Sequence, residues 1–216
     1  MSIKVLLADD HAVLRDGLKM ILEEKSDISV IGTATNGLTA IEKADQLDPD
    51  VIIMDISMPK MNGLEATTRI KDRHPEIEIL ILSMKYSRED ILRALKAGAV
   101  GYILKESASK EVVQAVRAAN SGHRFLSRKV DEIVIDSYIK GQKEPNGKDP
   151  LEILSSRERE ILQFVAEGYT NKEIANTLFI SEKTVATYRS RMMDKLGLDN
   201  LSDLIKFAIK HDVTSL

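Results

Sequence analysis

The chain has 216 residues, of which 43% are hydrophobic and 30% are charged, and its formal net charge is −3. This length allows two modest domains with packed cores, and the small negative charge excludes a generally basic protein that coats nucleic acid. The absence of cysteine excludes disulfides and thiolate sites, and no apolar run approaches the roughly 20 residues that cross a bilayer. We therefore expect a soluble protein of the cytoplasm with no membrane partner.

Residues 3–122 alternate short apolar runs with amphipathic stretches, which is the pattern of a parallel α/β domain. The expected strands cover residues 4–8, 28–34, 51–55, 79–83 and 101–104. The expected helices lie between and after them, at about 12–24, 37–47, 62–73, 87–97 and 109–121. We predict a doubly wound, five-stranded parallel (βα)5 domain over residues 1–123, with function gathered at the carboxyl ends of the strands.

A linker is predicted after this domain. One more amphipathic stretch, at about 127–140, leads into KGQKEPNGKDP, residues 140–150, which is rich in Gly, Pro, Asn and charge. We assign residues 124–153 as a linker that contains one helix.

The remainder of the chain is predicted to be helical. SSRE at 155–158 and TNKE at 170–173 both match the capping box that begins a helix, and Ser181 is placed to begin another. Gly168 and Gly197 are placed to end helices. We predict helices at about 156–167, 171–178, 182–196 and 200–210, forming an all-α four-helix domain over residues 154–216.

Ionisable side chains follow the expected strands. Asp9 and Asp10 follow the first strand and Asp55 ends the third, and adjacent carboxylates repel one another unless a cation offsets their charge. Oxygen ligands without cysteine suit Mg²⁺. Ser83 ends the fourth strand and Lys105 follows the fifth, so the set predicts a pocket in which a carboxylate accepts a phosphoryl group.

The stretches LLADDH, VIIMDISMPKMNGLE, ILILS and AGAVGYILK occur in an order and spacing that resemble the receiver domain of bacterial two-component response regulators. The resemblance implies that Asp55 is the phosphoacceptor and that Lys105 pairs with the phosphate. It also implies Mg²⁺ ligands and switch residues. The implied ligands are Asp9, Asp10, Asp55 and the backbone carbonyl of Ser57; the switch positions are Ser83 and Tyr102; and Pro59 and Gly63 match the loop after the acceptor.

Enzymatic functions fit the sequence less well. A phosphatase with an aspartyl intermediate would need a second Asp two residues after the first, and Ser57 stands there. The chain has no GxGxxG after the first strand and no GxxxxGK[ST], so it lacks both common phosphate cradles. We predict that the protein is not an enzyme. His11, at the start of a helix, is more typical of a solvated or structural side chain than of a ligand.

The helices at 171–178 and 182–196, separated by three residues, have helix-turn-helix spacing, in which the second helix enters the major groove of DNA. Between Lys183 and Lys195 four basic residues stand against the single acid Asp194. For Lys195, the sequence favours two interpretations equally: a DNA contact and a solvated side chain. Candidate DNA contacts are Thr170, Asn171, Lys183, Thr184, Thr187, Tyr188, Ser190 and Arg191.

LSSREREIL, NKEIA, ISEKTV and KLGL are similar to LuxR/FixJ-type DNA-binding domains. With the receiver, this similarity implies a response regulator of the NarL/FixJ subfamily that a sensor histidine kinase phosphorylates. It implies a homodimer on double-stranded DNA that regulates transcription, with RNA polymerase as a further partner. Many relatives have histidine at Tyr188 and lysine at Ala186 and Ser190, so the base specificity does not transfer.

Two questions remain open from the sequence. The alternative function is a phosphorylation-independent DNA-binding regulator that uses its receiver mainly for dimerisation. The last helix carries an apolar stripe that suits either a dimer seam or burial within its own domain. The stripe comprises Leu201, Leu204, Ile205, Ala208 and Ile209.

Overall fold

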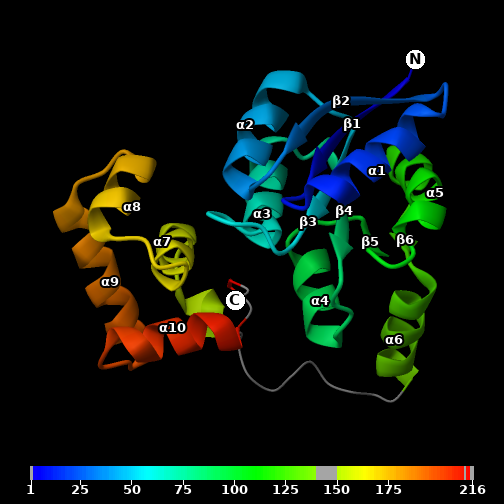
Figure 1. The fold of residues 1–216 in the computed structure, drawn as a ribbon. Coiled ribbons are helices and arrows are strands. Elements are labelled where there is room, and N and C mark those ends of the chain that lie inside the picture. The colour runs from blue at the N-terminus through cyan, green and yellow to red at the C-terminus, as the bar shows by residue number, and fades with distance from the viewer. Residues whose placement is uncertain (1, 140–149, 212, 215–216) are drawn as a thin grey trace. The chain divides into compact units, whose positions relative to one another are not determined.

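The computed structural model describes residues 2–139, 150–211 and 213–214 and divides into two compact units. The first unit holds a sheet with helices α1–α6, and the second holds helices α7–α10 (Figure 1). None of the helices in these ranges has both the length and the apolar character that crossing a membrane requires. Of the linker segment predicted at 140–150, residues 140–149 lie outside the described residues, and the boundaries predicted at 123 and 153 stay predictions.

The first unit alternates strands and helices along the chain. Its parallel sheet has the strand order β2-β1-β3-β4-β5-β6, which is the doubly wound arrangement expected. The elements are β1 (Ile3–Ala8), α1 (Ala12–Glu23), β2 (Ile28–Ala34), α2 (Gly37–Leu47), β3 (Val51–Asp55), α3 (Gly63–Arg73), β4 (Glu78–Ser83), α4 (Arg88–Lys96), β5 (Gly101–Leu104), α5 (Ala108–Asn120), β6 (Phe125–Leu126) and α6 (Arg128–Ile139).

Both faces of the sheet are covered, so its central strands are apolar on both sides. Helices α1 and α5 pack together on one face, and α2 and α3 pack together on the other (Figure 1). Along β4, Leu80 and Leu82 belong to the core beneath α1 and α5. Ile79 and Ile81 alternate with them and are also buried.

The prediction of five strands was wrong, because the sheet has a sixth, β6, at the edge beside β5. Phe125 and Leu126 pair in parallel with Gly101 and Tyr102. The close approach depends on Gly101, because a Cβ there would lie 2.5 Å from the carbonyl oxygen of Phe125. Two residues are too few to show an alternating pattern, so periodicity could not reveal this strand.

The second unit consists of the four predicted helices after a short 3₁₀ turn, η1 (Pro150–Ile153). They are α7 (Ser156–Ala166), α8 (Asn171–Leu178), α9 (Glu182–Leu196) and α10 (Leu201–Lys210). Both predicted capping boxes are present, at Ser155 with Glu158 and at Thr170 with Glu173. Ser181 caps α9, and Gly197 ends it in a left-handed conformation.

Candidate functional site

The carboxyl ends of β1 and β3 bring two buried acidic side chains together. β1 pairs with β3 so that Ala8 lies opposite Met54. The next residues, Asp9 and Asp55, therefore share one edge of the sheet, and each residue is 2% exposed. Asp10 follows at the rim with its side chain 33% exposed. The predicted convergence of these three carboxylates is therefore found in the structure.

Lys105 supplies the positive charge inside this cluster. Its Nζ lies 2.8 Å from Oδ2 of Asp9 and 2.8 Å from Oδ2 of Asp55, and its side chain is 9% exposed. The backbone amide of Lys105 donates to the carbonyl of Ser83, which holds the β5–α5 connection against β4. One ammonium thus faces two buried carboxylates, which leaves the buried set one negative charge in excess.

Burial and mutual repulsion change the acid–base properties of the cluster. Burial, with a smaller effect of the Asp9 charge, raises the pKa of Asp55, although Lys105 and the backbone amide of Ser57 act against this rise. Burial acts to lower the pKa of Lys105, but its bonds to Asp55 and Asp9 outweigh that effect and raise it. A further cation near Asp55 would therefore favour its ionised form.

The arrangement of oxygen atoms suits a divalent cation. One ligand atom from each of Asp9, Asp10, His11 and Asp55 lies within 4.8 Å of the others. The buried Oδ2 atoms of Asp9 and Asp55 share the single Lys105 ammonium and have no other partner within the described part of the chain. Mg²⁺ takes a few carboxylates and completes its octahedron with other oxygens, so this donor set fits it. The role of the Ser57 carbonyl stays a prediction.

His11 lies closer to the acidic pair than the sequence indicated. Its backbone amide donates to Oδ1 of Asp9 at 2.8 Å, and its Nδ1 lies 2.8 Å from Oδ1 of Asp10. The imidazole is nevertheless 65% exposed. The adjacency of these residues in DDH was the only signal of this contact, and adjacency alone does not fix where a side chain points.

Ser83 and Tyr102 both contact the loop that follows β4. The Ser83 hydroxyl accepts a hydrogen bond from the amide of Lys85 at 3.0 Å, and the Tyr102 hydroxyl donates to the carbonyl of Lys85 at 2.8 Å. Tyr102 is fully buried, and burial raises its pKa, so the hydroxyl stays protonated and able to donate. The two predicted switch positions are thus joined through one residue.

The loop after Asp55 depends on Gly63. A Cβ there would lie 2.0 Å from the carbonyl oxygen of Asp55, so only glycine fits at the first residue of α3. Asn62 caps this helix by accepting from the amide of Glu65. The glycine therefore allows α3 to begin directly against the end of β3.

In the second unit, one side of α9 presents polar and basic side chains. Lys183, Ala186, Thr187, Ser190 and Arg191 are exposed, whereas Val185 and Met192 are buried in the core of the unit. A hollow of about 320 Å³ lies along the same helix. It is lined by Ser181, Lys183, Thr184, Thr187, Tyr188 and Arg191.

Three polar residues near α9 make contacts within their own unit. Oδ1 of Asn171 accepts a hydrogen bond from Arg189 at 2.6 Å, so this predicted contact residue ties α8 to α9. Thr170 is engaged in its capping box. Lys195 donates to the buried Glu158 at 2.7 Å, and neither of its two equally favoured interpretations included this bond.

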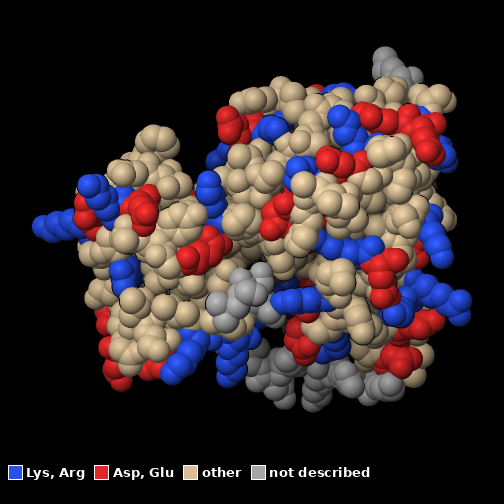
Figure 2. Space-filling model, in the orientation of Figure 1, with Lys and Arg blue, Asp and Glu red and all other residues tan. Residues whose placement is uncertain are grey.

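Figure 2 shows acidic and basic side chains interspersed over the visible face of each unit, without a broad field of one sign among the described residues. Basic side chains on this face therefore occur in small local groups. The exposed side of α9 carries Lys183 and Arg191 beside hydroxyl groups, a combination whose chemistry suits phosphate contacts.

The apolar stripe of the last helix is divided between two environments. Leu204 and Ala208 are fully buried, and α10 packs on α7. Leu201 is 42% exposed, and Ile205 and Ile209 are partly buried. The helix therefore uses part of its stripe for its own fold and leaves part of it accessible.

Two family models match the chain. Residues 5–117 match the response regulator receiver domain, and residues 152–208 match the luxR family of bacterial regulatory proteins. The chain belongs to the response regulators with a receiver and a LuxR-type DNA-binding domain. Response regulators with these two domains are transcription factors and not enzymes.

Full-length members of the family resemble this response regulator. The oxygen regulatory protein NreC of Staphylococcus aureus is 41% identical over 210 residues, covering 96% of this chain and 97% of NreC. RcsB of Salmonella enterica serovar Typhimurium, bound to a promoter in the presence of the phosphomimetic BeF₃⁻, is 28% identical, with a TM-score of 0.60 over 96% of this chain and 98% of RcsB. A structure of two RcsB dimers on two parallel DNAs is 28% identical, with a TM-score of 0.59 over 96% of this chain and 98% of that one.

Proposed function

We propose that Asp55 accepts a phosphoryl group from a phosphohistidine of a sensor histidine kinase. The observation that carries the proposal is the geometry of Asp55, which is buried with Lys105 at 2.8 Å and with two further acidic side chains beside it. The cluster lies within the part of the chain that matches the receiver model. A structural salt bridge would not need the additional carboxylates.

In the proposed step, an oxygen of the Asp55 carboxylate attacks phosphorus in line and forms the new O–P bond. The bond between phosphorus and the donor imidazole breaks, and the imidazole keeps the electron pair and takes up a proton. Lys105, already beside Asp55, stabilises the charge on the transferred oxygens. Mg²⁺, which Asp9, Asp10 and Asp55 would hold together with the Ser57 carbonyl, supplies additional charge neutralisation when it is bound.

The experiment is incubation with acetyl phosphate and Mg²⁺, followed by measurement of the intact mass. We expect the wild type to gain one phosphoryl group and Asp55→Asn to gain none. Asp72→Asn, an exposed aspartate on α3, is the matched control and should be phosphorylated like the wild type. A phosphoryl gain in Asp55→Asn would refute the assignment, and no gain in any variant would favour the phosphorylation-independent alternative.

The DNA-binding part of the proposal concerns α9. Its exposed side carries Lys183, Arg191, Thr184, Thr187, Tyr188 and Ser190, the chemistry that contacts phosphates and base edges in the major groove. Since RcsB binds DNA as dimers, we extend the proposal to a homodimer on two half-sites. The accessible part of α10 supports such a seam. Contact with RNA polymerase stays a prediction.

Phosphorylation would shift the populations of two conformations of the receiver. The conformation that binds the phosphoryl group better becomes more populated. Ser83 and Lys105 are the side chains positioned to bind the phosphoryl group in one state and not in the other. Without a phosphoryl group, the Ser83 hydroxyl accepts a hydrogen bond from the Lys85 amide, and Lys105 lies between the carboxylates of Asp9 and Asp55. A phosphoryl group on Asp55 would compete for both.

A further inference from the structure

Helix α6 begins as an integral part of the first unit. Ser127, directly before it, is 2% exposed. Its hydroxyl accepts the amide of Leu104 at 3.1 Å and donates to the carboxylate of Glu111, and its own amide donates to the carbonyl of Tyr102. The first turn of α6 is therefore fixed to β5 and α5, next to the residues that precede Lys105.

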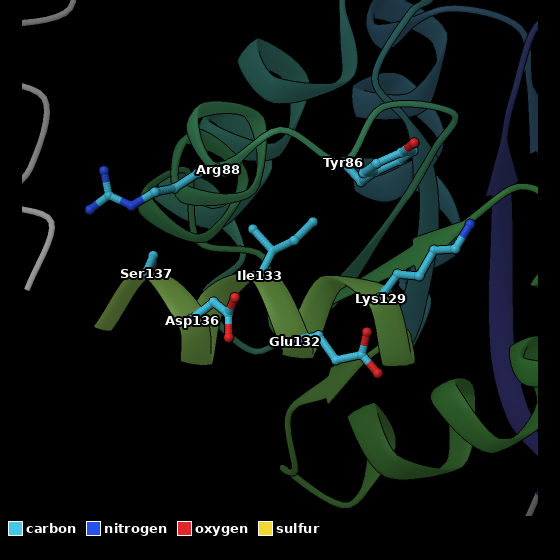
Figure 3. Close-up of a pocket in the computed structure, with 7 residues that line it drawn as sticks. All are labelled: Tyr86, Arg88, Lys129, Glu132, Ile133, Asp136 and Ser137. Atoms are coloured by element: carbon cyan, nitrogen blue, oxygen red, sulfur yellow. The ribbon is translucent and has the colours of Figure 1, made fainter. Parts of the chain in front are cut away.

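Lys129, in that first turn, contacts two separate loops. Its Nζ lies 2.6 Å from Oε1 of Glu106 and 5.6 Å from the centre of the Tyr86 ring, within reach of a cation–π interaction. Figure 3 shows Lys129 rising from α6 on the side of Tyr86. Glu106 directly follows Lys105, and Tyr86 lies three residues after Ser83. Lys129 thus bridges two chain segments that both lead away from the candidate phosphoacceptor site.

Those two segments are the ones that phosphorylation would displace. Glu106 directly follows Lys105, so a backbone shift that accompanies the turn of Lys105 from Asp9 toward phosphoryl oxygens also moves Glu106. When the Ser83 hydroxyl turns toward the same oxygens, the Lys85 amide loses its acceptor, and the loop that carries Tyr86 is released on that side. Both partners of Lys129 are therefore sensitive to the same event.

The surroundings of Lys129 permit a change of position. The side chains of Lys129 and Glu106 are 55% and 54% exposed, and exposed ion pairs are weak, so displacement of either partner is enough to separate them. A hollow of about 400 Å³ lies between Tyr86, the start of α4 and α6 (Figure 3). It is lined by Tyr86, Arg88, Lys129, Glu132, Ile133, Asp136 and Ser137. Helix α6 thus packs on α4 with open space alongside the contact.

We propose that Lys129 is a positioning residue that couples the state of Asp55 to helix α6, by holding Tyr86 and Glu106 at the same time. The inference rests on the proposed function and adds the contacts through which a change at Asp55 reaches α6. Helix α6 is the last described helix before the DNA-binding unit in the chain, so the first element to respond outside the receiver loops is the one that leads to that unit.

The test is hydrogen–deuterium exchange of the full chain with and without BeF₃⁻ and Mg²⁺. Two groups of peptides are compared, those spanning residues 101–107 at the site and those spanning residues 128–139 in α6. In the wild type, BeF₃⁻ with Mg²⁺ should change the rate of amide hydrogen exchange in both groups of peptides. In Lys129→Met the change at the site should remain while the change in α6 is lost, and Lys129→Arg should restore it because arginine keeps the charge.

Arg128→Met is the matched control, because it removes the same charge from the adjacent residue, which is 90% exposed and, among the described residues, pairs with Glu132 one turn along α6. It should respond as the wild type does. The inference is overturned if α6 of Lys129→Met still responds fully, if Arg128→Met loses the response equally, or if the wild-type site responds without α6. A wild-type site that does not respond would refute the proposed function itself, and the inference with it.

Discussion

The ammonium of Lys105 lies 2.8 Å from an oxygen of the Asp55 carboxylate, and both groups are almost entirely removed from solvent. Desolvating two charges is costly, and their attraction offsets this cost only while both partners are present. A second buried carboxylate, Asp9, draws on the same ammonium. The site is therefore held together by a charge balance that a bound cation or phosphoryl group would alter.

Replacing Lys105 by Met should destabilise the receiver unit by about 3 kcal/mol in the absence of divalent ions, because two buried carboxylates lose their counter-charge. Saturating Mg²⁺ should recover part of this loss, so the stabilisation by Mg²⁺ should be larger in the variant than in the wild type. Urea unfolding with EDTA and with Mg²⁺ measures both effects. Lys110→Met, on the exposed side of α5, removes the same charge as a control, and equal Mg²⁺ responses in the two variants would contradict the prediction.

Two glycine substitutions should have opposite effects. Gly63→Ala places a Cβ 2.0 Å from the carbonyl of Asp55 and should cost about 3 kcal/mol of stability. Gly17→Ala, within α1, meets no atom within 4 Å and should stabilise the protein by about 0.5–1 kcal/mol through helix propensity. Thermal unfolding of both variants checks the signs. A destabilised Gly17→Ala would mean that the accessible side of α1 is more constrained than its surroundings indicate.

Glu158 should make the second unit sensitive to acid. Burial opposes its ionisation, but hydrogen bonds from Lys195 and Ser155 outweigh burial and lower its pKa. The resulting stabilisation is fully present above the ordinary glutamate pKa and is lost as the pH falls through the lowered folded-state value. Glu158→Gln should therefore cost about 1–2 kcal/mol near pH ~7 and progressively less at lower pH.

The measurement for this prediction is chemical denaturation across a pH series, followed by circular dichroism. Glu182→Gln changes an exposed acid in the first turn of α9 and serves as the control, with little expected effect at any pH. A Glu158→Gln deficit that stays constant into acid would show that the glutamine removes packing and not an ionised hydrogen-bond acceptor.

The basic residues of α9 should separate into phosphate contacts and a structural contact. Lys183→Ala and Arg191→Ala should each weaken DNA binding and reduce the slope of log affinity against log salt by about one per subunit. Lys195→Ala removes the same charge from the same helix but breaks the bond to Glu158, so it should lower stability and leave the slope unchanged. Fluorescence anisotropy over a salt series gives these slopes, and an identical slope change in all three variants would defeat the distinction.

The sequence was sufficient for features that depend on local periodicity and on separated motifs. The five long strands and their helices were predicted because a parallel sheet alternates two clear patterns. Asp9, Asp55 and Lys105 were placed because each lies at the carboxyl end of a strand or directly after it. Three of the four terminal helices were predicted from their capping residues, which act within three positions of one another.

Features that depend on tertiary contacts could not be predicted in this way. The bond from Arg189 to Asn171 and the bond from Lys195 to Glu158 join helices at distances of 18 and 37 residues along the chain. The pairing of β6 depends on how closely Gly101 allows another backbone to approach. In each case the side-chain type was compatible with several partners, and only the packing of the elements selected one.

The short strand β6 and Ser127 also protect the margin of the sheet. They occupy the outer side of β5, where Ser127 provides the partners of the Leu104 amide and the Tyr102 carbonyl. A fragment that ended at residue 123 would expose β5 as an unpaired edge strand. Such an edge can pair with the same edge of another molecule, which leads to aggregation. A soluble fragment of the first unit should therefore include β6 and Ser127.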